Sequence, residues 1–203
     1  MTVIGWQLGR PGADGAPGSA AELTDAMVLP AGAVLPAVLP SREPDDREFV
    51  TGERDADRPR VAPQIMFLLR EDLEGPGVTA AGVCAAASVA AGLAVTADDG
   101  ATVTGVRFAA HALPCDFDLS LVGALLELGG DVVATAAGAA IAGHPAEAVA
   151  RFANERAAAG DAPLRRGQIV GSGLLIEPMP VTGPGEAAAV FGRLGTVSLS
   201  VAG

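Results

Sequence analysis

The sequence predicts one α+β domain in which strands dominate and helices are few, and three observations lead to this fold class. Short apolar runs bounded by glycine and proline recur along most of the chain, a pattern typical of strands. The pair Gly129 and Gly130 separates two such runs, which predicts a hairpin. One stretch predicts a longer helix, because Pro145 stands at its start, an apolar face follows and Gly160 stands just past its end.

The N-terminal part is predicted to contain one strand and then mostly loops. Thr2–Leu8 can form the strand, and the glycines and prolines that follow it interrupt any regular structure. Two short extended pieces come next, because Pro30 and Pro36 prevent a continuous helix. The charged residues 41–60 have little to bury and form either a solvated loop or a lid. The domain 1–203 is therefore expected to comprise an N-terminal strand with loops (1–40), the charged loop or lid (41–60) and a core (61–203).

The first half of the core is predicted to hold three strands and one helix. Gln64–Arg70 is a short apolar run and predicts a buried strand. Thr79 can cap a helix that runs from Ala80 to about Ala90. Two further strands are expected at Gly92–Thr96 and Thr102–Ala109, which are rich in β-branched residues.

The second half of the core is predicted to hold the hairpin, the longer helix and the last strands. The hairpin spans Leu119–Ala136, and glycine at its turn permits positive φ. Val149 and Phe152 supply the apolar face of the helix. The remainder, Gln168–Val181 and Glu186–Val201, is expected to be strand and turn.

The composition excludes several kinds of chemistry and partner. All 13 basic side chains are arginine and there is no tyrosine, which excludes a lysine Schiff base, a lysine base and a tyrosine acid. The formal charge of −11 repels nucleic-acid phosphates and anionic membranes, so we expect neither as a partner. The expected partner is a small molecule or another protein.

The cysteine count and the first residues predict a compartment. Two cysteines cannot form a disulfide framework for a chain of 203 residues, which favours a reducing environment. The N-terminal residues have neither a basic segment nor a long apolar run. We therefore expect a soluble, cytoplasmic protein.

A distinctive order of motifs runs through residues 118–203. It comprises Asp118–Gly123, Gly130–Ala140, Gly143–Pro145, Leu164–Gly173 and Phe191–Ser198. Weaker matches occur at Gly5–Gly9, Leu23–Met27 and Pro59–Phe67. Together these motifs resemble the 2-keto-4-pentenoate hydratase branch of the fumarylacetoacetate hydrolase superfamily, and the resemblance covers 118–203 almost throughout.

The resemblance implies both a fold and a chemistry. The implied fold is a mixed β-roll or barrel of the α+β class with few helices, assembled as a homodimer or a higher homo-oligomer. The family's pocket takes a small 2-oxo acid. There Mg²⁺ or Mn²⁺, held by a Glu-x-Glu pair and a third carboxylate, stabilises the enolate, and an N-terminal lysine assists proton transfer. This arrangement is physically sound because hard cations bind oxygen ligands and neutralise the developing negative charge.

The chain departs from the family at each of these positions. Ala62 and Gln64 stand where the family has the Glu-x-Glu pair, and Gln7 stands where it has the lysine. If Ala94 aligns with the third carboxylate, every ligand has been lost. A methyl group cannot bind a metal and one neutral amide binds Mg²⁺ poorly, so we expect no metal ion and no other cofactor.

Gln7 and Gln64 are the leading candidates for catalysis, because their amides can hydrogen-bond and polarise a carbonyl without a metal. Alternatively, they are ordinary polar replacements in an unused cavity. His111 is a third catalytic candidate, since it lies near Cys115 and Asp116 in a loop, although neighbours on a loop need not converge.

The predicted substrate-binding residues are Ala62, Met66, Ser172 and Leu175. Ala62 and Met66 share a strand face with Gln64 because alternate residues of a strand point the same way. Ser172 also suits a tight sheet crossing, which we favour, and His144 suits a helix cap better than a catalytic role.

The preferred functional hypothesis is a retooled, metal-independent lyase or cyclase of specialised metabolism. It would use the hydratase-like pocket to cyclise or rearrange an unsaturated, oxo-containing small molecule. Two alternatives remain open. One is a non-catalytic partner subunit of an active hydratase or decarboxylase paralogue. The other is a residual Mg²⁺-dependent 2-oxo acid hydratase that uses Asp98 or Asp99 as a replacement ligand.

Overall fold

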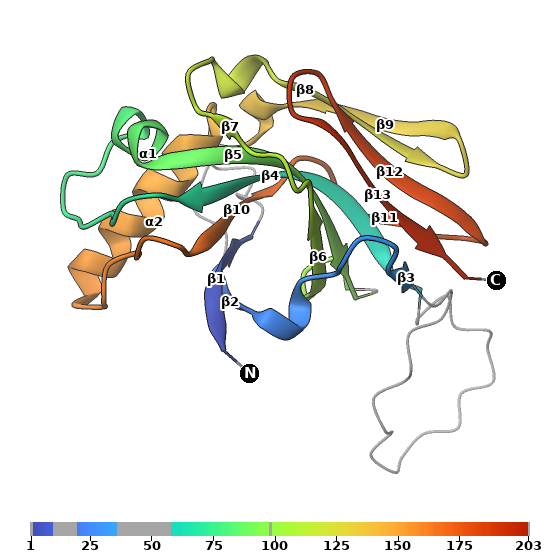
Figure 1. Cartoon of the computed structure of the whole chain (residues 1–203), viewed down its shortest axis with the longest axis horizontal. Coiled ribbons are helices and arrows are strands. Elements are labelled where there is room, and N and C mark those ends of the chain that lie inside the picture. Colours follow the sequence, from blue (N-terminus) through green and yellow to red (C-terminus); the bar gives the residue numbers. More distant parts are fainter. Residues whose placement is uncertain (1, 10–19, 36–57, 98, 203) are drawn as a thin grey trace, which may run out of the picture.

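The computed structural model describes residues 2–9, 20–35, 58–97 and 99–202, and within them two β-sheets and two α-helices enclose a common core (Figure 1). Most of the segment that the sequence predicts as a loop or lid, residues 41–57, lies outside the described residues. Asp98, one of the two possible replacement ligands, also lies outside them.

The larger sheet curls strongly into a half barrel (Figure 1). Its described strands are β1 (Val3–Leu8), β2 (Ala20–Thr24), β4 (Arg60–Leu69), β5 (Ala87–Thr96), β6 (Val103–Phe108), β7 (Leu113–Pro114), β10 (Ile169–Leu174) and β11 (Met179–Pro180). The order is β2-β1-β10-β4-β5-β6, with β11 beside β4 and β7 beside β5. β1 and β10 pair in parallel, whereas β10, β4, β5 and β6 pair antiparallel. Strands from both ends of the chain thus lie side by side.

The smaller sheet covers the core from the other side. Its described strands are β3 (Val34–Leu35), β8 (Gly123–Leu128), β9 (Asp131–Ala137), β12 (Gly185–Phe191) and β13 (Gly195–Val201), in the order β3-β13-β12-β8-β9. The predicted hairpin is confirmed as β8 and β9. Gly129 and Gly130 at its turn have φ values of 61° and 92°, a conformation that glycine adopts without strain.

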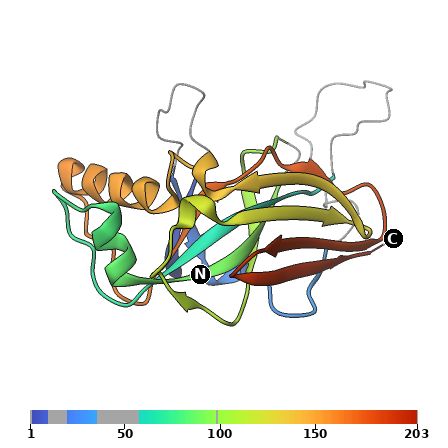
Figure 2. The ribbon, with the colours of Figure 1, turned by 90° about the horizontal axis from the view of Figure 1, so that it is seen from above.

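The helices gather at the end of the molecule opposite the β8–β9 and β12–β13 hairpins (Figure 2). They are α1 (Ala80–Ala86) and α2 (Pro145–Ala159), and the described residues also form the 3₁₀ turns η1 (Asp25–Met27), η3 (Leu119–Leu121) and η4 (Gly138–Ala140). α2 begins at Pro145 and is followed by Gly160 in the left-handed conformation, as predicted. No helix in the described part of the chain is long and apolar enough to cross a membrane.

The structure corrects the predicted helix at 80–90. Thr79 does cap it, because its Oγ1 accepts a hydrogen bond from the Gly82 amide at 3.1 Å, but the helix ends at Ala86. The chain then continues as β5, which pairs with β4 along ten residues. Alanine has the highest helix propensity, but propensity is a weak determinant and the pairing of two buried strands overrides it.

β4 also begins earlier than predicted, at Arg60, and includes Pro63. The partner on one side of β4 changes from β11, at Arg60 and Val61, to β10, at Gln64 and beyond. Pro63 lies between these two ladders, so its missing N–H interrupts neither of them.

Alternate side chains of β4 point to opposite faces of the larger sheet. The main core takes Val61, Ile65, Phe67 and Leu69, which pack with the smaller sheet and α2. The opposite side of the strand carries Ala62, Gln64 and Met66. This is the alternation that the sequence predicts, and it places Gln64 away from the core.

One side chain of α2 fixes the loop that leads to α1. Asn154 Oδ1 accepts hydrogen bonds from the amides of Gly77 and Val78 at 2.8 and 2.9 Å, and its Nδ2 donates to the Val78 carbonyl at 2.8 Å. We expect Asn154→Ala to lower the free energy of unfolding by about 2 kcal/mol, since three hydrogen bonds are lost and backbone groups lose their partners. Denaturant unfolding measures this, with the exposed neighbour Glu155→Ala as the control. Equal stability of the two variants would contradict the assignment.

Candidate functional site

Gln7 of β1 and Gln64 of β4 form a buried amide pair on the side of the larger sheet opposite the core. Trp6 packs toward α2, with its ring centroid 5.4 Å from that of Phe152, so the neighbouring Gln7 points to the other face. The Nε2 of Gln7 donates to Oε1 of Gln64 at 2.7 Å and to the Leu8 carbonyl at 3.0 Å. Gln7 is 2% exposed and Gln64 is 0% exposed. The structure therefore brings the two leading candidate residues together.

A glycine in the intervening strand allows this pair to form. β10 lies between β1 and β4, and Gly171 is the register partner of both Gln7 and Met66. A Cβ added at Gly171 would lie 2.4 Å from Oε1 of Gln7 and 2.8 Å from Oε1 of Gln64. The missing side chain at position 171 thus leaves the space in which the two amides meet.

Aliphatic side chains adjoin the amide pair. Ala62, Ala94 and Leu174 form a small buried cluster, in which Ala62 lies directly opposite Ala94 in the β4–β5 ladder. Leu174 is the register partner of Gln64. Two hydrogen-bonding groups therefore lie against an apolar wall.

A pocket of about 500 Å³ opens beside the pair, and Gln7, Leu174, Asp99 and Glu177 are among the residues that line it. Its volume lies in the range of about 300–1,000 Å³ that is usual for small-molecule sites. The lining combines β1 with the end of β10 and the turn that precedes β6. Of the amide pair, Gln7 is among the described residues that line the pocket, whereas Gln64 is fully buried beside it and is not.

The structure moves one predicted substrate-binding residue to another place. Leu175 lies in the main core and is 2% exposed, whereas its neighbour Leu174 lines the pocket. The register of β10 against β4 shifts between Gly171 and Leu174. A shift of one residue turns a side chain to the opposite face of a sheet, which exchanges the roles of the two leucines.

The groups beside Gln64 do not fit a divalent cation. Ala62 and Ala94 have no ligand atoms in their side chains, and Gln64 offers one neutral amide. Mg²⁺ and Mn²⁺ bind chiefly through carboxylates and other oxygen ligands, several at a time. In the part of the chain that the structure describes, no three His, Cys, Asp or Glu side chains gather where they could hold a metal ion.

Asp99 lines the pocket but uses its carboxylate within its own turn. Oδ1 accepts from the amides of Ala101 and Thr102, both at 2.8 Å, and Oδ2 accepts from the Thr102 hydroxyl at 2.6 Å. The hydroxyl bond, followed by the two amide bonds, lowers the pKa of Asp99 below its usual value. Asp99 is therefore a fixed negative charge at the pocket rather than an available metal ligand.

Ser172 and Met66 are fully buried, and their side chains pack against or bond to other residues of the protein. Ser172 is fully buried, and its Oγ accepts from the Ile65 amide and donates to the Gly173 carbonyl, both at 3.2 Å. These bonds hold the backbone where β10 shifts register against β4, which agrees with a tight sheet crossing. Met66 packs in a buried cluster with Leu23. It shares the Gln64 side of β4, and like Gln64 and the predicted substrate-binding residue Ala62 it is not among the described residues that line the pocket.

The structure does not bring His111 to the amide pair. His111 is exposed between β6 and β7 and is not among the described pocket-lining residues. The side-chain hydrogen bond between Cys115, near it in sequence, and Cys84 of α1 is the main reason that the pKa of Cys115 is raised, and it lowers the pKa of Cys84. A thiol that stays protonated is a poor nucleophile, so the raised pKa and the absence of this residue from the described pocket lining do not support Cys115 as the nucleophile.

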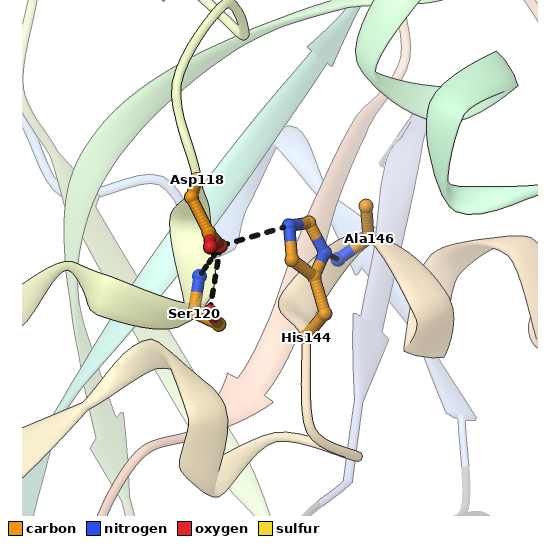
Figure 3. Close-up of polar contacts among 4 residues, drawn as sticks. All are labelled: Asp118, Ser120, His144 and Ala146. Atoms are coloured by element: carbon orange, nitrogen blue, oxygen red, sulfur yellow. Dashed lines mark hydrogen bonds and ion pairs between the residues drawn. The ribbon is translucent and has the colours of Figure 1, made fainter.

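His144 stands at the start of α2 beside Asp118 and Ser120 (Figure 3). Its Nδ1 accepts from the Ala146 amide at 3.2 Å, and its Nε2 lies 3.7 Å from Oδ1 of Asp118. Ser120 donates its hydroxyl to Asp118 at 2.6 Å, and this bond is the main cause of the lowered pKa of Asp118. Because the serine bonds to the carboxylate and the imidazole caps the helix, the three side chains form a structural junction, as the cap prediction for His144 implies.

Sequence reasoning missed Leu174, Asp99 and Glu177 as pocket residues. Leu174 was hidden by the register shift in β10. The sequence indicates Asp99 only as a possible metal ligand, and Glu177 follows β10 in a stretch that has no motif. The proximity of Asp99 and Glu177 depends on the pairing of distant strands, and no local pattern reports such pairing.

Comparisons with known proteins agree with this architecture. No family model matches the chain. The 2-hydroxyhexa-2,4-dienoate hydratase of Comamonas testosteroni is 31% identical over 161 residues, which cover 70% of this chain and 60% of that protein. The 4-oxalocrotonate decarboxylase of Pseudomonas sp. strain CF600 is 29% identical over 144 residues, which cover 63% of this chain and 54% of that protein. The chain thus matches less than two thirds of the length of these relatives.

The fold has a close counterpart among solved structures. The 4-oxalocrotonate decarboxylase from Pseudomonas putida G7, complexed with magnesium and adipate, superposes with a TM-score of 0.80 and 22% sequence identity. The match covers 99% of this chain and 78% of that chain. The predicted hydratase-like α+β fold is confirmed. In sequence over part of its length, and in fold, the chain is similar to members of the hydratase-like branch of the fumarylacetoacetate hydrolase superfamily.

Proposed function

We propose that this protein is an enzyme that cyclises or rearranges an unsaturated, oxo-containing small molecule without a resident divalent metal ion. The observation that carries the proposal is the buried Gln7–Gln64 amide pair, which adjoins a pocket and an aliphatic wall. In the sequence resemblance these two positions belong to the lysine and to one of the metal ligands. The chain has replaced charged groups with neutral hydrogen-bonding groups, so its chemistry differs from that of a metal-bound enolate.

The amide pair suits a reaction that requires restraint and polarisation. Gln64 Nε2 can donate to a substrate carbonyl and stabilise the negative charge that develops on its oxygen. Leu174, which lines the pocket and packs on the buried Ala62 and Ala94, can hold an unsaturated chain in a folded conformation that brings its reacting atoms together. Closing a ring within one molecule changes no overall composition, so this reaction needs neither an oxidant nor a second substrate.

We expect Gln64→Leu to lower the rate of cyclisation by about 100-fold, which is a typical effect of removing one donor from a developing oxyanion. The assay incubates the purified chain in chelator with linear unsaturated oxo compounds and follows a product of unchanged mass by chromatography and NMR. Gln168→Leu is the matched control, because Gln168 accepts from the Arg165 amide and takes no part in the Gln7–Gln64 hydrogen bond. Equal loss of activity in both variants would contradict the role of Gln64.

The same assay addresses the residual hydratase. With 2-hydroxyhexa-2,4-dienoate as substrate, a Mg²⁺-dependent hydratase would add water only when the metal is present. We expect no such activity, since the donor set beside Gln64 does not suit the ion. Hydration that chelator abolishes would overturn the metal-independent mechanism.

A second candidate function is that of a non-catalytic partner subunit. Exposed aliphatic side chains favour association with another chain, since Leu121 is 78% exposed and Val132 and Val133 of β9 are 53% and 38% exposed. Exposed aliphatic side chains of this kind could also join two copies of this chain in the homo-oligomer that we propose. Activity of the chain when it is purified alone would exclude the partner-subunit function.

A further inference from the structure

The hydrogen bonds of the amide pair leave one acceptor and one donor for a ligand. Gln7 Nε2 uses its two hydrogens on Leu8 and Gln64, which fixes the orientation of that amide and leaves its Oε1 as an acceptor. Gln64 Oε1 accepts from Gln7, which leaves Gln64 Nε2 as a donor. Neither Gln7 Oε1 nor Gln64 Nε2 has a partner among the described residues, and both atoms are buried. A buried polar atom without a partner is costly, so the pair favours a ligand that supplies both bonds.

The two unpartnered atoms belong to amides joined at 2.7 Å, so they lie within the span of one small molecule. A carboxylate cannot satisfy them, because it accepts hydrogen bonds but donates none and would place its charge against Gln7 Oε1. A group with an N–H or O–H next to a carbonyl can satisfy them. It donates to Gln7 and accepts from Gln64.

The charge of the pocket leads to the same ligand class. Among its described lining residues, the ionisable side chains are Asp99 and Glu177, and both are acidic. Arg60, at the start of β4, directs its Nη1 to the Pro178 carbonyl at 3.3 Å and is not among the described lining residues. An anionic ligand would meet the fixed charge of Asp99 and would find no arginine in the described lining.

We infer that this pocket binds uncharged oxo compounds that carry a hydrogen-bond donor next to the carbonyl, such as lactams and enolic ketones, and that it rejects carboxylates. The inference rests on the proposed function for its location at the amide pair, and it specifies the class of substrate. It also separates this chain from relatives, one of which was crystallised with adipate. The apolar remainder of the ligand would lie against Leu174 and its neighbours.

Two probes that differ in one group test the inference. The lactam 6-pentylpiperidin-2-one and the lactone 6-pentyloxan-2-one have nearly the same shape, but only the lactam has a donor. We expect the lactam to bind about tenfold more tightly, as one hydrogen bond to a buried acceptor allows, and adipate to bind more weakly than either. Ligand-observed NMR titration measures all three. Equal affinity for lactam and lactone, or tighter binding of adipate, would overturn the inference.

Variants test whether Gln7 causes the preference for lactam over lactone. Gln7→Met keeps the length of the side chain but removes the acceptor. The variant should therefore bind the lactam and the lactone with about equal affinity. Gln168→Leu should keep the wild-type preference. A preference that persists in a folded Gln7→Met variant would overturn the assignment, and the wild-type comparison remains decisive if that variant does not fold.

The binding test can contradict the ligand class without contradicting the enzyme proposal, and the activity test can do the reverse. Lactam preference without cyclisation of any substrate would support the ligand class and contradict the enzyme proposal. Cyclisation by a chain that binds lactam and lactone equally would contradict only the ligand class.

Discussion

The double variant Ala62→Glu/Gln64→Glu should gain a stability that depends on Mn²⁺, which the natural chain lacks. Both side chains would lie on the same face of β4, next to Ala94, in an environment where positions 62 and 64 are 0% exposed. Two buried carboxylates without a partner cost several kcal/mol, so in chelator we expect the melting temperature to fall by about 10 °C. Millimolar Mn²⁺ should recover about half of this loss, because it binds the folded state.

Thermal melting in chelator and in Mn²⁺ measures the effect. Ala62→Gln is the matched control, since it adds a similar volume beside Gln64 without charge. It should melt at the same temperature in both solutions. If the natural chain gained as much from Mn²⁺ as the double variant does, the metal-independent mechanism would be wrong.

Gly171→Ala should separate the amide pair with limited damage to the fold. The new Cβ would lie 2.4 Å from Gln7 Oε1 and 2.8 Å from Gln64 Oε1, which are the ends of flexible side chains, so the amides must move. We expect the unfolding free energy to fall by about 1–3 kcal/mol, as in other overpacked sites. Cyclisation should slow by about 1,000-fold, since both polar contacts to the substrate are displaced.

Two comparisons isolate the cause of that effect. Gly192→Ala is the matched glycine control, because no atom outside its neighbours lies within 4 Å of the added Cβ. In a Gln7→Ala background, Gly171→Ala should cost much less stability, because the atom nearest to the new methyl group has been removed. An unchanged cost would show that the methyl group disturbs the backbone instead.

Local sequence patterns were sufficient to predict the helices and strands whose ends carry glycine or proline. The glycine pair between β8 and β9 predicts its turn because few other residues adopt positive φ at both positions. Pro145 and Gly160 mark α2 for similar reasons. The end of α1 could not be predicted, because an alanine-rich run has no periodicity to show where it leaves a helix and enters a strand. The pairing of β1 with β10 joins residues that are distant in the chain, and no local pattern encodes it.

The candidate site was predictable to the extent that it follows strand alternation. Gln64 and Ala62 were placed on one face correctly because a strand has a period of two. The meeting of Gln7 and Gln64 depends on Gly171 between them, and only the sheet order reveals that glycine's role. Leu175 was predicted in place of Leu174 because a register shift leaves no mark in the sequence.

The division of β4 into two faces separates the packing of the main core from the surroundings of the amide pair. Packing of the main core rests on Val61, Ile65 and Phe67, while Ala62, Gln64 and Met66 face the other way. A combinatorial library of small, uncharged side chains at positions 62 and 64 could therefore change ligand preference while it leaves the packing of the main core in place. Because the two faces are separate, an ancestral enzyme could have acquired a different reaction through substitutions on one face of a single strand.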